Sequence, residues 1–269
     1  MTVFHVSKLR LARAMAHNEE LARLWNSIPA GELCSFLPRI DPQGNGSIRA
    51  VRVKPIPDEF SLRLGEMLYQ LRSALDACVY QAAVLTTKSD PPPKETGLEF
   101  PITNDRDEFP KLAKRRLGGL PPDLVSEIEK VQPYNIPTNL PQKKLISNIN
   151  RCLGILNDLA RKDRHRKLHI VGSAPLRFEP LFSLPDGVRV VDVQTNASTL
   201  LEEQAEIATF KLIGFRGSVN IKVNPNMMTS IGCTEPPPPC DASDTFAQRL
   251  TEIINAVGHI IFAFENHHF

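Results

Sequence analysis

The fold of this chain follows from residues 64–82, which read LGEMLYQLRSALDACVYQA. Apolar side chains recur in this stretch at intervals of three and four residues, the spacing that gathers them on one face of an α-helix. They are Leu64, Met67, Leu68, Leu71, Leu75, Cys78, Val79 and Ala82. The stretch therefore predicts a long helix over residues 59–87 with one buried face.

Similar apolar stripes predict four more helices, over residues 7–27, 122–131, 141–162 and 243–265. Pro141 suits the first turn of its helix, and Ser243 or Asp244 is a suitable N-cap for the last one. The three long helices and the N-terminal helix are expected to form a bundle, in which the last helix packs on the other two long ones.

The strand signals fall in two places. A turn at residues 43–46 and the alternating run that follows it predict a short N-terminal strand pair, whereas residues 97–120 look irregular. Beyond Lys167, short β-branched or alternating runs predict one contiguous antiparallel sheet over residues 168–234. The runs cover residues 168–174, 176–184, 187–195, 205–215 and 217–224.

These elements predict the α+β class, a bundle of long helices with an antiparallel β-sheet inserted before the C-terminal helix. Residues 1–167 form a mainly helical part with the strand pair, residues 168–234 form the sheet, and residues 235–269 carry the helix that returns to the bundle.

Composition excludes several classes of protein. The chain has 269 residues and a net charge of +2, so any binding of nucleic acid must come from local patches of charge. The longest apolar runs, such as residues 260–264, are too short to cross a membrane, and the N-terminus has no secretory signal. We therefore expect a cytoplasmic protein without a membrane partner. Cys233 and Cys240 flank four prolines, but a reducing cytoplasm favours free thiols over a disulfide between them.

Residues 161–169, RKDRHRKLH, carry five cationic side chains and two histidines at the end of a predicted helix. Such a cluster can hold a phosphate and transfer protons beside it. It can equally be a solvated helix end, where basic side chains suit the helix dipole and Asp163, Arg164 and Arg166 pair with one another.

Other chemistry is poorly represented. The histidines near the C-terminus match no zinc spacing, Gly118-Gly119 is not followed by the residues of a phosphate loop, and no nucleophile elbow is present. The sequence therefore predicts neither a metal nor a cofactor.

Four motifs occur in a fixed order between residues 60 and 170. This part of the chain resembles a widespread group of uncharacterised bacterial proteins, for which no activity is established. The motifs are LRSALD at 71–76, EFPI at 99–102, QPY at 132–134 and DRHR at 163–166.

A more distant resemblance is to HEPN-type helical domains, many of which are metal-independent ribonucleases with an Arg-x4–6-His motif. It implies RNA as a partner, a homodimer, and a role in stress response or phage defence. In the bacterial group the first motif usually continues to a histidine, but Ala77 stands there in this chain. The second occurrence is intact, from Arg164 to His169. The resemblance implies that Arg164 clamps a phosphate while His165 and His169 serve in catalysis.

A second group of residues is expected to bind rather than to react. Arg72 and Asp76 lie four residues apart on the long helix, where they either pair within the helix or reach across to the segment 163–166. The candidate binding residues are Arg72, Asp76, Asp163, Arg166 and Lys167. Two hypotheses stay open: an RNA-binding or RNA-cleaving protein, and a non-catalytic structural or interaction protein whose charged network only stabilises the bundle.

Overall fold

The structure is a computed structural model, and it describes residues 4–28, 30–51, 53–136, 145–173, 180–196, 200–214, 222–224, 230–234 and 245–267. The described helices are α1 (His5–Asn26), α2 (Ala30–Leu33), α3 (Asp58–Thr87), α4 (Phe109–Arg116), α5 (Pro122–Lys130), α6 (Leu145–His165) and α7 (Phe246–Glu265). Short 3₁₀ turns span Glu95–Gly97 and Pro133–Asn135. None of the described helices is long and apolar enough to cross a membrane.

The described strands are β1 (Ser35–Ile40), β2 (Asn45–Val51), β3 (Ile170–Ser173), β4 (Leu181–Ser183), β5 (Arg189–Thr195), β6 (Glu206–Ile213), β7 (Lys222–Asn224) and β8 (Ser230–Cys233). They form a four-stranded antiparallel sheet in the order β1-β2-β6-β5 and two separate ribbons, β3-β8 and β4-β7. The α+β class and the placement of these strands before the last helix are as predicted.

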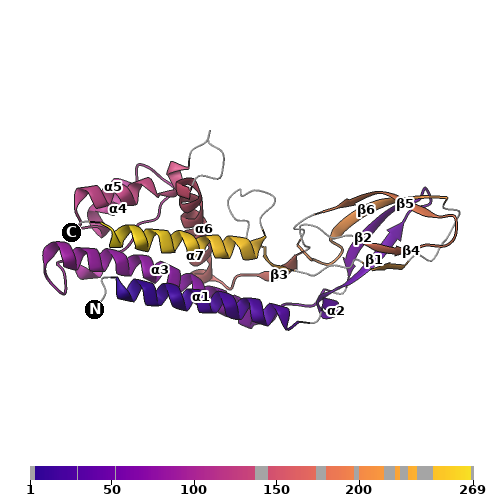
Figure 1. Cartoon of the computed structure of the whole chain (residues 1–269), viewed down its shortest axis with the longest axis horizontal. Coiled ribbons are helices and arrows are strands. Elements are labelled where there is room, and N and C mark those ends of the chain that lie inside the picture. Colours follow the sequence, from indigo (N-terminus) through magenta and orange to yellow (C-terminus); the bar gives the residue numbers. More distant parts are fainter. Residues whose placement is uncertain are drawn as a thin grey trace.

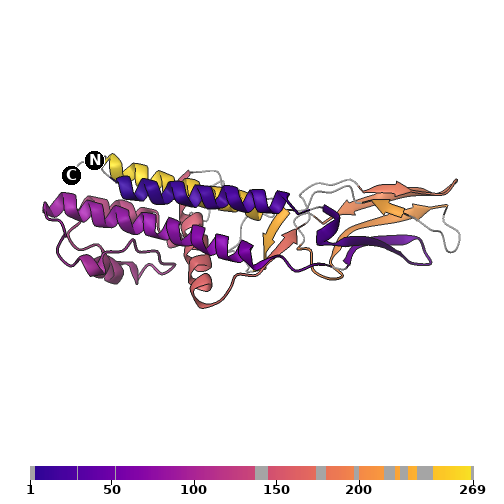
Figure 2. The same cartoon turned by 90° about the horizontal axis from the view of Figure 1, so that it is seen from below.

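The long helices form the predicted bundle. Helices α1, α3 and α7 run side by side along the molecule, and α6 packs against α3 and α7 (Figures 1 and 2). The stripe that predicted α3 is its buried face, because Leu64, Met67, Leu68, Leu71 and Leu75 have no exposed surface. This core fixes α1, α3 and α6, the three helices that carry the candidate site.

The prediction of one contiguous sheet over residues 168–234 was wrong. The N-terminal strand pair joins β6 through a ladder from Asn45 to Arg49. The main sheet therefore contains β1 and β2, which precede the long helices in the sequence, and β5 and β6, which follow α6. A second core beneath it buries Ile48, Ala50, Ile207 and Phe210. The four-stranded sheet and the termini lie at opposite ends of the molecule (Figure 1).

Two local predictions also need correction. Residues 109–116, predicted as irregular, form helix α4, whose apolar side buries Phe109 and Leu112. The N-cap of α7 is Thr245, which forms a capping box: its hydroxyl accepts from the Gln248 amide, and its own amide donates to the Gln248 side chain. Residues 141, 240, 243 and 244 lie outside the described residues.

Candidate functional site

The first and last of the four motifs meet in one pocket. It has a volume of about 220 Å³ and lies between α3 and α6. Its lining includes Gly65, Tyr69, Arg72, Ser73, Asp76, Glu99, Asp163 and Arg164. Residues about ninety positions apart in the sequence thus share one site, as expected for charged groups that border two facing apolar stripes.

Arg72 and Asp76 hold the backbone of Phe100 between them. The Arg72 guanidinium donates to the Phe100 carbonyl at 3.1 Å, and the Asp76 carboxylate accepts from the Phe100 amide at 2.9 Å. The two side chains approach each other at 3.8 Å, which is the predicted pair within the helix. Burial raises the pKa of Asp76, which Arg72 opposes, and lowers the pKa of Arg72, which Asp76 opposes.

The QPY motif also holds the loop at residues 99–103, which contains Phe100. The buried Gln132 side chain accepts from the Thr103 amide at 3.0 Å and donates to the Pro101 carbonyl at 2.9 Å. Asn150 on α6 in turn donates to the Gln132 carbonyl at 2.8 Å. The EFPI and QPY motifs are therefore one hydrogen-bonded unit that fixes the loop beside the pocket.

One atom of this network remains without a partner. Nη1 of Arg72 is buried and forms no hydrogen bond within the described part of the chain. A buried donor without an acceptor costs free energy, and the Arg72 side chain lines the pocket. It becomes a donor for a ligand in the pocket only when a small displacement of its neighbours exposes it.

A second hollow continues the pocket towards α1. Its volume is about 470 Å³, and Arg13 and His17 of α1 line it together with Arg63, Glu66 and Gln70 of α3. Gly65, Tyr69 and Asp163 line both hollows. We call the two hollows together the helical groove.

Tyr69 is the exposed aromatic side chain of this groove. Its exposed fraction of 62% is high for a large ring, and it belongs to α3 at the boundary that the hollows share. Arginines line the hollows on both sides of that boundary, Arg13 and Arg63 in one and Arg72 and Arg164 in the other. An aromatic ring among guanidinium groups is the arrangement on which nucleic-acid bases stack.

Most acidic groups of the groove are already paired. Glu66 contacts Arg63 at 3.3 Å, and Asp76 contacts Arg72. Glu99 contacts Arg116, just outside the groove, at 3.0 Å. Within the described chain Arg13, Asp163 and Arg164 form no ion pair. Arg13 and Arg164 therefore favour the binding of an anion, whereas Asp163 opposes it.

Asp163 lies directly over Gly65. A β-carbon at Gly65 would be 2.6 Å from one carboxylate oxygen and 2.7 Å from the other. The carboxylate is partly buried and has no hydrogen-bond partner within the described chain, and burial raises its pKa. The expected direct contact between this segment and Arg72 or Asp76 is not formed; the groups share the groove instead.

The structure separates the predicted catalytic residues. Arg164 lines the groove, but His165 is the exposed last residue of α6 and lines neither hollow. His169 follows the helix end, lines a different pocket of about 270 Å³ and approaches the Thr234 hydroxyl at 3.3 Å. The Arg-x4-His spacing spans the end of a helix and does not bring both side chains into one pocket.

The remaining predicted binding residues lie outside the groove. Lys167 pairs with Asp58 at the start of α3, and the Arg166 amide donates to the Lys162 carbonyl. The predicted pairing of Asp163 with Arg164 is not formed. Asp158 carries the ion pairs at this helix end, with Lys162 at 2.7 Å and Arg161 at 3.2 Å.

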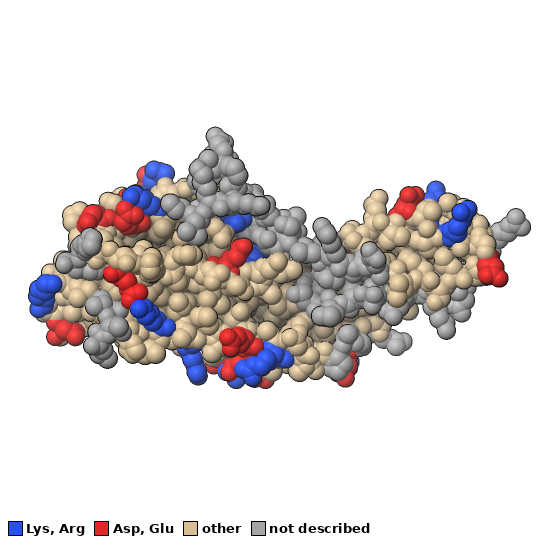
Figure 3. Space-filling model, in the orientation of Figure 1, with Lys and Arg blue, Asp and Glu red and all other residues tan. Residues whose placement is uncertain are grey.

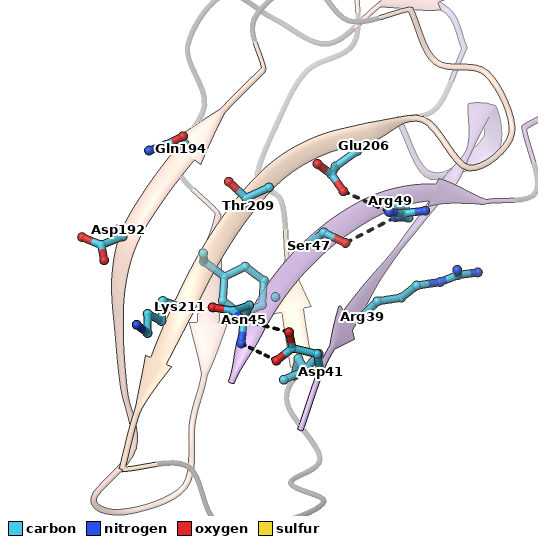
Figure 4. Close-up of a pocket in the computed structure, with 13 residues that line it drawn as sticks. Arg39, Asp41, Asn45, Ser47, Arg49, Asp192, Gln194, Glu206, Thr209 and Lys211 are labelled. Atoms are coloured by element: carbon cyan, nitrogen blue, oxygen red, sulfur yellow. Dashed lines mark hydrogen bonds and ion pairs between the residues drawn. The ribbon is translucent and has the colours of Figure 1, made fainter. Parts of the chain in front are cut away.

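Sequence reasoning missed a hollow on the four-stranded sheet. It has a volume of about 610 Å³, and polar side chains from neighbouring strands line it (Figure 4). Arg49 pairs with Glu206 at 3.1 Å, and Asp41 accepts from Asn45 at 2.8 Å. Arg39, Asp192 and Lys211 also line this hollow and form no ion pair within the described residues, but unlike the helical groove it has no exposed aromatic side chain. Strand alternation alone predicts a polar face here.

Charges of both signs are mixed on the face shown in Figure 3, where blue and red atoms lie next to one another over the helical end. The described residues contain no cluster of His, Cys, Asp or Glu that could hold a metal ion. Cys34 and Cys78 are free thiols, and both are buried.

The chain was compared with known proteins in three ways. No family model, no curated protein and no solved structure matches it. The resemblance to the bacterial group and to HEPN domains therefore stays a prediction, and the helical groove is the basis on which a function can be argued.

Proposed function

We propose that this protein binds single-stranded RNA along the helical groove. The observation that carries the proposal is the exposed Tyr69 at the boundary of two hollows, each lined by arginines. Single-stranded RNA offers unstacked bases to an aromatic ring and phosphates to guanidinium groups, so both kinds of side chain have a role. The binding is local, in keeping with a net charge of only +2.

Phosphate contacts fall to Arg164 and Arg72. Arg164 has no ion-pair partner in the described chain, and Nη1 of Arg72 has no acceptor. Guanidinium groups bind phosphate oxygens with paired, charge-assisted hydrogen bonds. The carbonyl of Phe100 already orients the Arg72 side chain, so a small opening of the pocket is enough to present its unused donor to a phosphate.

Binding is placed ahead of cleavage for a geometric reason. Cleavage through the predicted motif needs His165 or His169 to take the proton of a ribose hydroxyl, and both lie outside the two hollows. The predicted ribonuclease activity, homodimer and link to stress or phage defence remain part of the hypothesis. So does the cytoplasmic location, with which the free thiols of Cys34 and Cys78 agree.

The test is a titration of labelled single-stranded RNA of roughly 12 nucleotides with wild-type protein and with Tyr69→Ala. Stacking contributes about 1–3 kcal/mol per base, so Tyr69→Ala should raise the Kd roughly 5- to 150-fold. Phe262→Ala is the matched control, because Phe262 is an equally exposed aromatic on α7 outside the groove. Binding that is absent, or that both substitutions weaken equally, overturns the proposal.

The structural alternative has its own supporting observation. Arg72 and Asp76 bond both polar groups of the Phe100 backbone, which is what a purely stabilising network does. On this alternative the motifs only fix the loop at residues 99–103 against the bundle. It predicts a folded protein that binds no RNA, and the same titration distinguishes the two.

A further inference from the structure

Asp163 is the acidic residue common to both hollows of the helical groove. Its carboxylate lies over the backbone of α3 at Gly65, where no side chain intervenes. Within the described chain it accepts no hydrogen bond, although burial already disfavours its charged form and raises its pKa. Water can reach this partly buried carboxylate, and a ligand that enters the groove can replace the water with a donor of its own.

The neighbours of Asp163 define what such a ligand must look like. Tyr69 and Gly65 line both hollows with it, and Arg72 and Arg164 line the inner one. A base stacked on Tyr69 and a phosphate on the arginines leave the sugar of the same nucleotide to face Asp163. A carboxylate repels phosphate but accepts a hydrogen bond from a hydroxyl.

We propose that Asp163 accepts a hydrogen bond from the ribose 2′-hydroxyl, so that the helical groove selects RNA over DNA. The inference rests on the proposed function and adds the class of nucleic acid to it. The 2′-hydroxyl is the group by which proteins distinguish the two polymers at a given site. An ionised acceptor makes a stronger hydrogen bond than a neutral one, and DNA leaves that acceptor without a donor.

The experiment compares three strands of one sequence on the wild-type protein: RNA, its 2′-O-methyl analogue and DNA. The methylated strand keeps the 2′-oxygen but has no hydroxyl proton to donate. We expect RNA to bind roughly tenfold more tightly than either of the others. Methylated RNA that binds as tightly as RNA overturns the inference without any substitution in the protein.

Two variants then locate the effect. Asp163→Ala should weaken RNA binding roughly tenfold and leave DNA binding unchanged or slightly tighter, because it removes an acceptor and a negative charge. Glu66→Ala is the matched control, since Glu66 is an acidic residue of the same groove that pairs with Arg63. It should change the affinities for RNA and DNA together, and a preference that survives Asp163→Ala contradicts the inference.

The failures of the two proposals are distinguishable. Equal binding of RNA and DNA that Tyr69→Ala still weakens overturns the role of Asp163 and leaves RNA binding in the groove intact. Absence of binding to all three strands overturns both.

Discussion

A β-carbon at Gly65 would lie 2.6 Å from Oδ2 of Asp163, so the absence of a side chain on α3 creates the place that the carboxylate occupies. This relationship joins α3 and α6 at the centre of the helical groove. It also allows the position of Asp163 to be changed without altering Asp163 itself.

Gly65→Ala should displace the Asp163 carboxylate and abolish the preference for RNA over DNA. Stability should change by less than about 1 kcal/mol, because alanine gains roughly 0.5–1 kcal/mol in a helix while the carboxylate must rotate away. Gly258→Ala, in the middle of α7, is the control: its new β-carbon meets Leu11 at an ordinary 3.5 Å. If Gly65→Ala stabilises the protein as Gly258→Ala does and leaves the preference intact, Asp163 has no fixed position there.

Asp163→Asn should raise the melting temperature at about pH 7. Burial raises the pKa of Asp163, so the folded protein holds this proton more tightly than the unfolded chain. Wild-type stability therefore falls as the pH rises from the ordinary value of 3.8 through the raised pKa, and asparagine escapes that loss. The gain should vanish below pH 3.8, which thermal unfolding at the two pH values will measure.

Asp158→Asn provides the comparison of opposite sign. Burial would raise the pKa of Asp158, but hydrogen bonds from Lys162 and Arg161 outweigh burial and lower the pKa. The ionised form stabilises the fold at about pH 7, so this substitution should lower the melting temperature there. Equal responses of the two variants would show that burial does not govern Asp163.

Asp76→Ala should cost about 1–3 kcal/mol of unfolding free energy, measured by urea denaturation. The substitution leaves the Phe100 amide without its acceptor and Arg72 without a carboxylate. Asp58→Ala breaks the exposed pair with Lys167 instead and should cost less than about 1 kcal/mol. Equal stability of the Asp76→Ala variant and wild type would mean that the network contributes nothing to the fold.

The helices could be predicted from the sequence because their apolar stripes are local and long. The four-stranded sheet could not be predicted, because its central ladder joins Asn45 to Lys211 and the sequence of a strand does not show which other strand it pairs with. Helix α4 was missed because its eight residues, half of them basic, are fewer than the stretch over which helical periodicity can be recognised.

The site was half predictable for a related reason. The charged margins of two apolar stripes predicted that Arg72 and Asp76 lie near the segment 163–166, and Asp163 and Arg164 share one pocket with them. Sequence spacing cannot show that α6 ends at His165, which separates Arg164 from His169. Nor does it show that Tyr69 is exposed between two hollows, because it lies beside the apolar stripe of α3 and could equally have been buried.

Substitutions at Arg164 and His169 distinguish the predicted Arg-x4-His site from the helical groove. Arg164→Ala should weaken RNA binding roughly tenfold and reduce the salt dependence of the Kd by about one phosphate contact. His169→Ala should leave the Kd within about twofold of wild type, because His169 lines another pocket. Titrations at several salt concentrations, with EDTA present, measure both.

Cleavage of the RNA in the same mixtures completes the test. A working Arg-x4-His pair would make both substitutions lower a metal-independent cleavage rate by roughly 10²-fold, the usual effect of losing one acid–base or charge-stabilising group. The geometry leads us to expect otherwise: Arg164→Ala impairs binding alone, and His169→Ala changes neither binding nor cleavage. Loss of cleavage in His169→Ala with unchanged RNA affinity would show that the histidine reaches the bound strand and would restore the catalytic hypothesis.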